Sequence, residues 1–245
     1  APPSSASAPP SSATAPPTPR TLLVEQHVDG PVPLEADGTH RRVWPTACIL
    51  AKYLSQHQAL IRGKRVGELG AGSGAVGLAC AALGAASVTL TDQPEALPLI
   101  RANAERNAAL IAAAAAAESG GSAAAASPGG AAVKVMPCTW GDEAHIGELL
   151  EANGGVPYDV VVCCEVVYKQ SEPVLLALAH TQQRLMAKAK PGGVALLAYE
   201  YRGELFDDLA YFDAANELFE VEPLSLRAFE GDLLDEEYED SRWLY

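Results

Sequence analysis

The fold of this 245-residue chain depends on one stretch of its sequence, Glu68-Leu69-Gly70-Ala71-Gly72-Ser73-Gly74-Ala75-Val76-Gly77. The apolar segment 64–69 before the glycines predicts a buried strand, and the small apolar residues of 75–83 predict a helix. Glycine adopts positive φ without a steric cost and lets the backbone approach a ligand closely. The stretch therefore predicts a ligand-binding turn between a strand and a helix.

Two classes of cofactor fit such a turn. From Gly72 onward it also matches the GxGxxG fingerprint of dinucleotide-binding proteins, in which a pyrophosphate sits on the helix N-terminus. S-adenosylmethionine has no phosphate but has a sulfonium and a charged amino-acid tail, and Glu68 suits a site built around positive charge. The turn alone leaves both open, and residues farther along the chain favour the methyl donor.

Strands and helices alternate through the rest of the chain. We predict further strands at 87–91, 133–137, 159–164, 194–199, 219–223 and 241–245, and a strand at Leu22-Leu23-Val24 that leads into the domain. We predict further helices at 43–57, 94–107, 172–187 and 204–215. Such alternation predicts an α/β protein whose parallel sheet is covered by helices on both faces.

Two segments of low complexity set the domain boundaries. Residues 1–20 are almost entirely Ala, Pro and Ser, a composition typical of a disordered tail. We expect one domain over 21–245, interrupted at 108–132 by an Ala/Gly/Ser-rich insertion without chemistry. Alanine has the highest helix propensity, so the preceding helix could extend to about residue 117.

The charge of the chain restricts its partners. The formal net charge is −14, and the segment 217–245 holds ten acidic residues against two arginines. Such a surface repels phosphate backbones and attracts a cationic partner such as a lysine-bearing protein face. No apolar run is long enough to span a bilayer, and the cysteines and histidines show no metal-ligand spacing. We therefore expect no nucleic acid, no membrane and no metal. We also expect a monomer located in the cytoplasm or also in the nucleus.

Polar and aromatic residues stand at the ends of the predicted strands, the edge at which open α/β sheets bind ligands. Asp92 can accept both ribose hydroxyls of a cofactor, or cap the next helix. Trp140 can cover an adenine, or pack in the core, and Trp44 has the same two interpretations. Glu165 and Tyr168 can project together from the fourth strand, or form a capping or packing pair.

In order along the chain, these motifs resemble the methyltransferase-like 21 family of seven-strand protein-lysine methyltransferases. The matching residues are Val43-Trp44-Pro45, Glu68 to Gly74, Thr91-Asp92, Asn103 with Asn107, Trp140-Gly141, Glu165 to Tyr168, and Tyr199-Glu200-Tyr201-Arg202. Asp235-Glu236-Glu237-Tyr238 is most similar to the member that methylates the AAA ATPase valosin-containing protein.

The resemblance implies a Rossmann-like, seven-stranded class I methyltransferase sheet whose last strand is antiparallel. It implies cofactor contacts at Trp44, Gly70, Ala71, Gly72, Asp92, Trp140 and Cys164. It also implies that Glu165 and Tyr168 form an acid-x-x-Tyr signature near the target lysine. Three residues depart from the family pattern: Glu165 replaces the commoner Asp, Thr139 stands where Asp often precedes the tryptophan, and Gly67 replaces a bulky residue, which should weaken its strand.

The function that the resemblance implies is transfer of a methyl group from S-adenosylmethionine to a protein lysine, with an AAA ATPase or a heat-shock chaperone as the substrate. Two alternatives keep the same fold. One is a small-molecule methyltransferase, because this fold serves many acceptors. The other is a non-catalytic protein-binding module. A nicotinamide oxidoreductase is disfavoured, because the chain has no evident second substrate domain.

Overall fold

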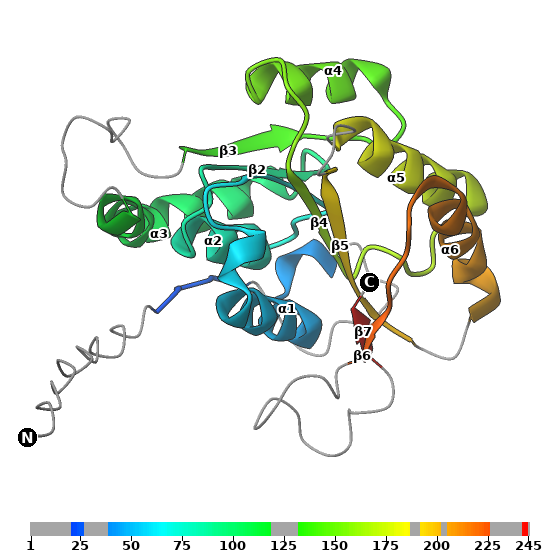
Figure 1. Cartoon of the computed structure of the whole chain (residues 1–245), viewed down its shortest axis with the longest axis horizontal. Helices are drawn as coiled ribbons and strands as arrows, with labels where there is room; N and C mark the ends of the chain where they lie inside the picture. Colours follow the sequence, from blue (N-terminus) through cyan, green and yellow to red (C-terminus); the bar gives the residue numbers. More distant parts are fainter. Residues whose placement is uncertain are drawn as a thin grey trace, which may run out of the picture.

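A computed structural model describes residues 21–26, 39–118, 132–186, 192–201, 205–225 and 242–244. Within these ranges the chain forms one seven-stranded sheet with helices on both faces, so the predicted α/β architecture is confirmed (Figure 1). No helix among these residues is both long and apolar enough to cross a membrane. The predicted tail, residues 1–20, lies outside the described residues.

The sheet has the strand order β3-β2-β1-β4-β5-β7-β6. Its strands are β1 (Arg65–Leu69), β2 (Ser87–Asp92), β3 (Ala132–Pro137), β4 (Val160–Cys164), β5 (Val194–Glu200), β6 (Leu224–Ser225) and β7 (Arg242–Leu244). The first five strands are parallel to one another, and β7 runs antiparallel to both β5 and β6. The parallel arrangement brings the carboxyl ends of β1, β2 and β4 to one edge, where the glycine turn lies.

The helices are α1 (Pro45–Gln56), α2 (Ala75–Ala82), α3 (Leu97–Glu118), α4 (Glu143–Ala152), α5 (Glu172–Leu185) and α6 (Leu205–Leu218), with short 3-10 helices η1 (Thr39–Arg41) and η2 (Gln58–Leu60). One face of the sheet packs on α1, α2 and α3, and the other packs on α4, α5 and α6. Successive strand residues alternate between the two cores. Val160 and Val162 enter the first, whereas Val161 and Cys163 enter the second.

The structure corrects two of the predicted strands. Leu22-Leu23-Val24 is not a strand of the sheet, because its backbone bonds to side chains of α3. Residues 219–223 are not a strand either: α6 continues to Leu218, and the sixth strand is only β6. Phe219 and Val221, which suggested a strand, pack against the second core from an irregular segment.

Helix α4 was missed altogether in the sequence. Asp142 caps it by accepting the N–H groups of Ala144 and His145, and it buries only Ile146 and Leu149. Helix α3 begins three residues later than predicted, at Leu97 with Pro98 in its first turn, and continues to Glu118. Its alanine-rich second half buries Ile111 and Ala114 in the core.

Gly67 in β1 makes room for an aromatic ring, contrary to the expectation that it only weakens the strand. A Cβ at Gly67 would lie 3.3 Å from two ring carbons of Tyr158. Tyr158 is buried, and its hydroxyl donates to the Leu149 carbonyl at 3.0 Å. The volume that a bulky residue would fill at this position of β1 is therefore filled by Tyr158 from the neighbouring loop.

We therefore expect Gly67→Val to destabilise the protein by about 1–3 kcal/mol, because overpacking displaces the Tyr158 ring. Gly147→Ala in α4 is the control. Its Cβ meets nothing within 4 Å, and alanine should stabilise the helix by roughly 0.5–1 kcal/mol. Urea unfolding measures both changes. An unchanged or raised midpoint for Gly67→Val would show that the glycine is a weakness rather than an accommodation.

Candidate active site

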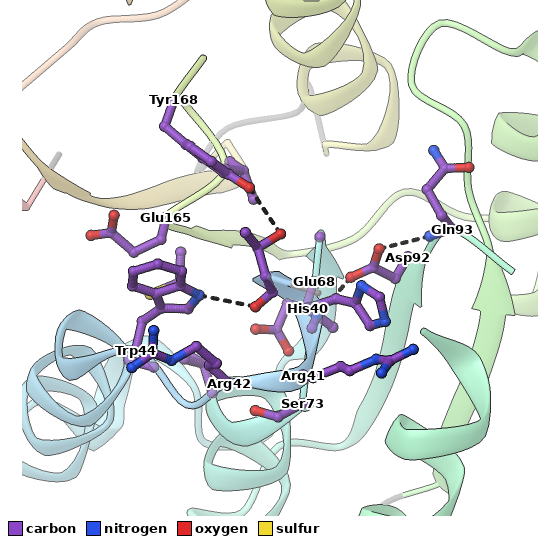
Figure 2. Close-up of a pocket in the computed structure, with 18 of the residues that line it drawn as sticks. His40, Arg41, Arg42, Trp44, Glu68, Ser73, Asp92, Gln93, Glu165 and Tyr168 are labelled. Carbon is purple, nitrogen blue, oxygen red and sulfur yellow. Dashed lines mark hydrogen bonds between the residues drawn. The ribbon is translucent and has the colours of Figure 1, made fainter. Parts of the chain in front are cut away.

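A cavity of about 760 Å³ opens at the carboxyl ends of the parallel strands (Figure 2). All ten residues predicted for the site line it: Trp44, Glu68, Gly70, Ala71, Gly72, Asp92, Trp140, Cys164, Glu165 and Tyr168. They come from the turn between β1 and α2, from the residue before α1, from the ends of β1, β2 and β4, and from the segments that follow β3 and β4. The structure thus brings together every side chain that the sequence proposed for the site, and their roles remain predictions.

The glycine turn needs its glycines for conformation and for space. Gly70, Gly72 and Gly74 have φ values of 67°, 56° and 80°. A Cβ at Gly70 would come within 2.5 Å of the Val166 side chain. Farther along, a Cβ at Gly77 would lie 2.5 Å from Glu68 Oε2, so α2 also approaches β1 closely. The turn is therefore fixed between β1, α2 and the segment after β4.

Asp92 joins the turn to the end of β2. Its Oδ2 accepts the Gly72 N–H at 2.7 Å, and its Oδ1 accepts the Gln93 N–H at 2.7 Å. Burial raises the pKa of Asp92, while the two N–H donors and the nearby His40 oppose that shift. Helix α3 begins only at Leu97, and the two N–H donors to Asp92, Gly72 and Gln93, both lie before it. The carboxylate therefore faces the cavity and anchors the glycine turn.

Glu68 is 1% exposed, and its Oε2 accepts the Gly77 N–H at 2.8 Å. Burial raises the pKa of Glu68 to about 8, against the Gly77 hydrogen bond and with a smaller contribution from Asp92. Its backbone carbonyl accepts the Thr91 hydroxyl at 2.7 Å, which ties β1 to β2. At neutral pH this side chain holds a proton that a cation bound in the cavity would displace.

Two indole rings line the cavity. The Trp44 Nε1–H donates to the Thr39 carbonyl at 3.2 Å, and Arg42 lies over its ring, 5.6 Å from the centroid. Trp140 fits both of its interpretations, because it lines the cavity and also packs against the second core. Cys164, at the end of β4, has a pKa that burial raises well above its usual value, so its thiol stays protonated.

Glu165 and Tyr168 lie on the side of the cavity opposite Asp92 and Gln93 (Figure 2). Glu165 is 6% exposed and has a φ of 56°, an unusual value for a residue with a side chain. Its N–H donates to the Ala198 carbonyl of β5 at 2.9 Å. Left-handed backbone in a non-glycine residue costs on the order of 1–3 kcal/mol and concentrates at functional sites. Neither residue caps α5, whose N-cap position is Ser171.

The 3-10 helix η1, which was not predicted, lies at the rim of the cavity between these two sides. The Tyr168 hydroxyl donates to Thr39 Oγ1 at 2.9 Å, and the Thr39 carbonyl accepts from Trp44. His40, Arg41 and Arg42 also line the cavity (Figure 2). No local pattern identifies Thr39, because its contact with Tyr168 spans 129 positions of the chain.

The donor set of the cavity fits S-adenosylmethionine. Glu68 and Asp92 suit a ligand with cationic groups and a ribose diol, and the rings of Trp44 and Trp140 offer faces to an adenine. Arg41 and Arg42 at the rim can pair with the carboxylate of the amino-acid tail. Fold and site together define a class I methyltransferase-like protein.

Comparison with known proteins finds similarity to lysine methyltransferases. Residues 34–119 match the profile of a family described as lysine methyltransferase. The protein N-terminal and lysine N-methyltransferase EFM7 of Yarrowia lipolytica is 32% identical over 180 residues, which cover 71% of this chain and 62% of that protein. EEF1A lysine methyltransferase 3 of Mus musculus is 34% identical over 167 residues, which cover 68% of this chain and 58% of that protein.

By sequence, residues 34–119 are therefore similar to the lysine methyltransferase family. The matched region spans less than two thirds of each curated relative named above. A TehB-like SAM-dependent methyltransferase from Corynebacterium glutamicum has a TM-score of 0.50 and 14% identity, with 83% of this chain and 86% of that chain covered. At that identity the likeness shows the fold alone.

The raised pKa of Glu68 predicts a pH-dependent stability. Because the folded state binds a proton that the unfolded state releases near its ordinary pKa, stability falls as pH rises toward about 8. One fully linked proton corresponds to a loss of roughly 2 kcal/mol between pH 6 and pH 8. Glu68→Gln keeps the size and the acceptor for Gly77, so this part of the pH dependence should disappear. Urea unfolding of the ligand-free chain at both pH values measures it, and parallel curves for the two proteins would contradict the assignment.

Proposed function

We propose that the chain transfers a methyl group from S-adenosylmethionine to a lysine ε-nitrogen of a protein. The observation that supports this most directly is the side-by-side placement of a methyl-donor cradle and a separate acid–phenol pair in one cavity. The cradle consists of the glycine turn, Asp92 and the indoles of Trp44 and Trp140. Glu165 and Tyr168 form the pair, held above Trp44 by the β4 terminus and by Thr39 (Figure 2).

When bound, S-adenosylmethionine supplies an electrophilic methyl group on a sulfonium. A lysine ammonium has no lone pair and must first lose a proton, which costs roughly 4.6 kcal/mol at pH 7 from a pKa of about 10.4. The Glu165 carboxylate attracts the ammonium into the cavity, orients the amine and takes up its proton through water. Tyr168 lines the cavity and can hold the incoming cation at its ring face, while its hydroxyl donates to Thr39 and so positions the ring. Alignment supplies most of the acceleration.

The substrate protein is proposed at the level of class. We keep an AAA ATPase or a heat-shock chaperone as first candidates, from the resemblance of the sequence to a member that methylates valosin-containing protein. The residues of that resemblance, Asp235 to Tyr238, lie outside the described residues. EEF1A, which the name of the mouse relative gives as its substrate, is the third candidate. A net charge of −14 favours a basic protein face in each case. Monomeric action in the cytoplasm or nucleus remains part of the proposal.

Variants of the acid–phenol pair test the proposed function. We expect Glu165→Gln to lower turnover about 100-fold, because the positioned carboxylate is lost, and Tyr168→Phe to lower it about tenfold. Glu165→Asp keeps the charge and the family's commoner residue, so most activity should remain. S-adenosylhomocysteine should bind all three variants within about threefold of wild type, because the cradle is intact. The assay is incorporation of labelled methyl from S-adenosylmethionine into purified candidate proteins.

Glu143→Gln is the matched control, because Glu143 lies on α4 outside the cavity in an exposed ion pair with Arg184. It should change neither turnover nor binding. Wild-type turnover in both Glu165→Gln and Tyr168→Phe would remove these residues from the acceptor site. Label that enters only small molecules would instead support a small-molecule acceptor, and a wild-type chain that binds no cofactor would support a non-catalytic module.

A further inference from the structure

Asn103 and Asn107 of α3 are buried amides to which the proposed chemistry gives no role. They are 0% and 2% exposed, and they stand one helical turn apart on the same face of α3. Buried amides need hydrogen-bond partners, because an unsatisfied buried polar group costs about 1–3 kcal/mol. The partners that they find belong to the N-terminal segment 21–26, which we name the strap.

The two amides bind the strap as a neighbouring strand would. Asn107 Oδ1 accepts the Leu23 N–H at 2.9 Å, and its Nδ2 donates to the Leu23 carbonyl at 2.7 Å. Asn103 repeats the pattern at Glu25, with distances of 2.7 Å and 3.0 Å. Alternate residues of an extended chain point their backbone N–H and C=O groups to the same side. Two amides on one helix face can therefore pair with Leu23 and Glu25 as the edge of a strand would. An ion pair between Arg106 and Glu25 adds to the contact.

Asn103 also reaches the glycine turn, whereas Asn107 does not. The Asn103 Nδ2 donates to the Ser73 carbonyl at 2.9 Å, in the middle of the turn. The additional bond from Asn107 goes to the Asn103 carbonyl within α3, at 2.8 Å. One buried amide group therefore connects the strap to the backbone of the proposed cofactor cradle.

The far end of the strap contacts a second part of the cradle. Gln26 Oε1 accepts the Val43 N–H at 3.0 Å, directly before Trp44. The Trp44 indole in turn donates to Thr39, which accepts from Tyr168. The strap is thus connected to the turn at Ser73 through Asn103 and bonds directly to the loop that presents the indole, although none of its residues lines the cavity.

We propose that the strap is a positioning element of the methyl-donor site: Asn103 fixes the Ser73 carbonyl of the glycine turn against it, and Gln26 fixes the loop that presents Trp44. The inference rests on the proposed function only in taking the cavity as the S-adenosylmethionine site. It is independent of the acceptor. Asn103 and Gln26 are then positioning residues, and Asn107 is an anchor for the strap alone.

The test is calorimetric titration of the full chain and its variants with S-adenosylhomocysteine at about 10 °C, where folding is checked by circular dichroism. Asn103→Ala and Asn107→Ala form a matched pair, because each removes both bonds to one strap residue. We expect Asn103→Ala to raise the dissociation constant roughly tenfold, and Asn107→Ala to raise it less than about threefold. A merely structural role would lower the unfolding temperature of both without separating their dissociation constants.

Gln26→Ala provides a second test that does not disturb the core, because Gln26 is exposed. We expect it to raise the dissociation constant roughly threefold. Gln58→Ala is the control, because the Gln58 amide bonds to Ser55 and Arg62 near η2, and it should have no effect. Wild-type affinity in Gln26→Ala and equal affinities in the two asparagine variants would overturn the inference alone. A wild-type chain that does not bind S-adenosylhomocysteine would overturn the proposed function and the inference together.

Discussion

The hydrogen bond from the Gly72 amide to the Asp92 carboxylate is the contact on which the rest of the site depends. It joins the turn after β1 to the end of β2, and its 2.7 Å length sets how far apart these two lie. Gly70 and Gly72 both have positive φ, and a Cβ at these residues would contact Val166 and His40, respectively. The turn can adopt this conformation because glycine has no Cβ. The cavity is thus defined by backbone geometry first and by side chains second.

Around this contact the titratable side chains lie at different depths. Glu68 lies beneath the turn and is kept protonated by burial, Asp92 faces the cavity, and arginines stand at the rim. A ligand with a zwitterionic tail and a sulfonium fits a cavity with Asp92 inside and arginines at the rim better than a doubly anionic pyrophosphate does. The same arrangement leaves Glu165, in its left-handed backbone, as the carboxylate beside the acceptor position. The match of residues 34–119 to a lysine methyltransferase profile is compatible with this fold, and the acceptor-side chemistry is proposed on that basis.

Much of the fold and most of the candidate site could be predicted because their signals are local. The glycine turn is contiguous, and Asp92, Trp140 and Glu165 each end a strand, so the parallel sheet brings them to one edge. Helix α4 was missed because only two of its residues are buried, although Asp142 marks its start. The strand predicted over 219–223 was wrong because Phe219 and Val221 pack on the core from an irregular segment. Contacts such as Thr39 with Tyr168 and Asn103 with Glu25 join distant positions, and no spacing rule predicts them.

We propose that the methyl donor binds against this glycine turn, between the two indole rings. Proton–nitrogen correlation spectra of the ¹⁵N-labelled chain during titration with S-adenosylhomocysteine test it most directly. If the donor binds there, the signals of the Gly70 and Gly72 amides and of the Trp44 and Trp140 indole N–H groups should shift. Gly147 and Gly154, at and beyond α4 and outside the cavity lining, should stay unchanged. If S-adenosylhomocysteine shifts other amide signals but leaves those of Gly70, Gly72 and both indoles unchanged, the donor does not bind at the glycine turn.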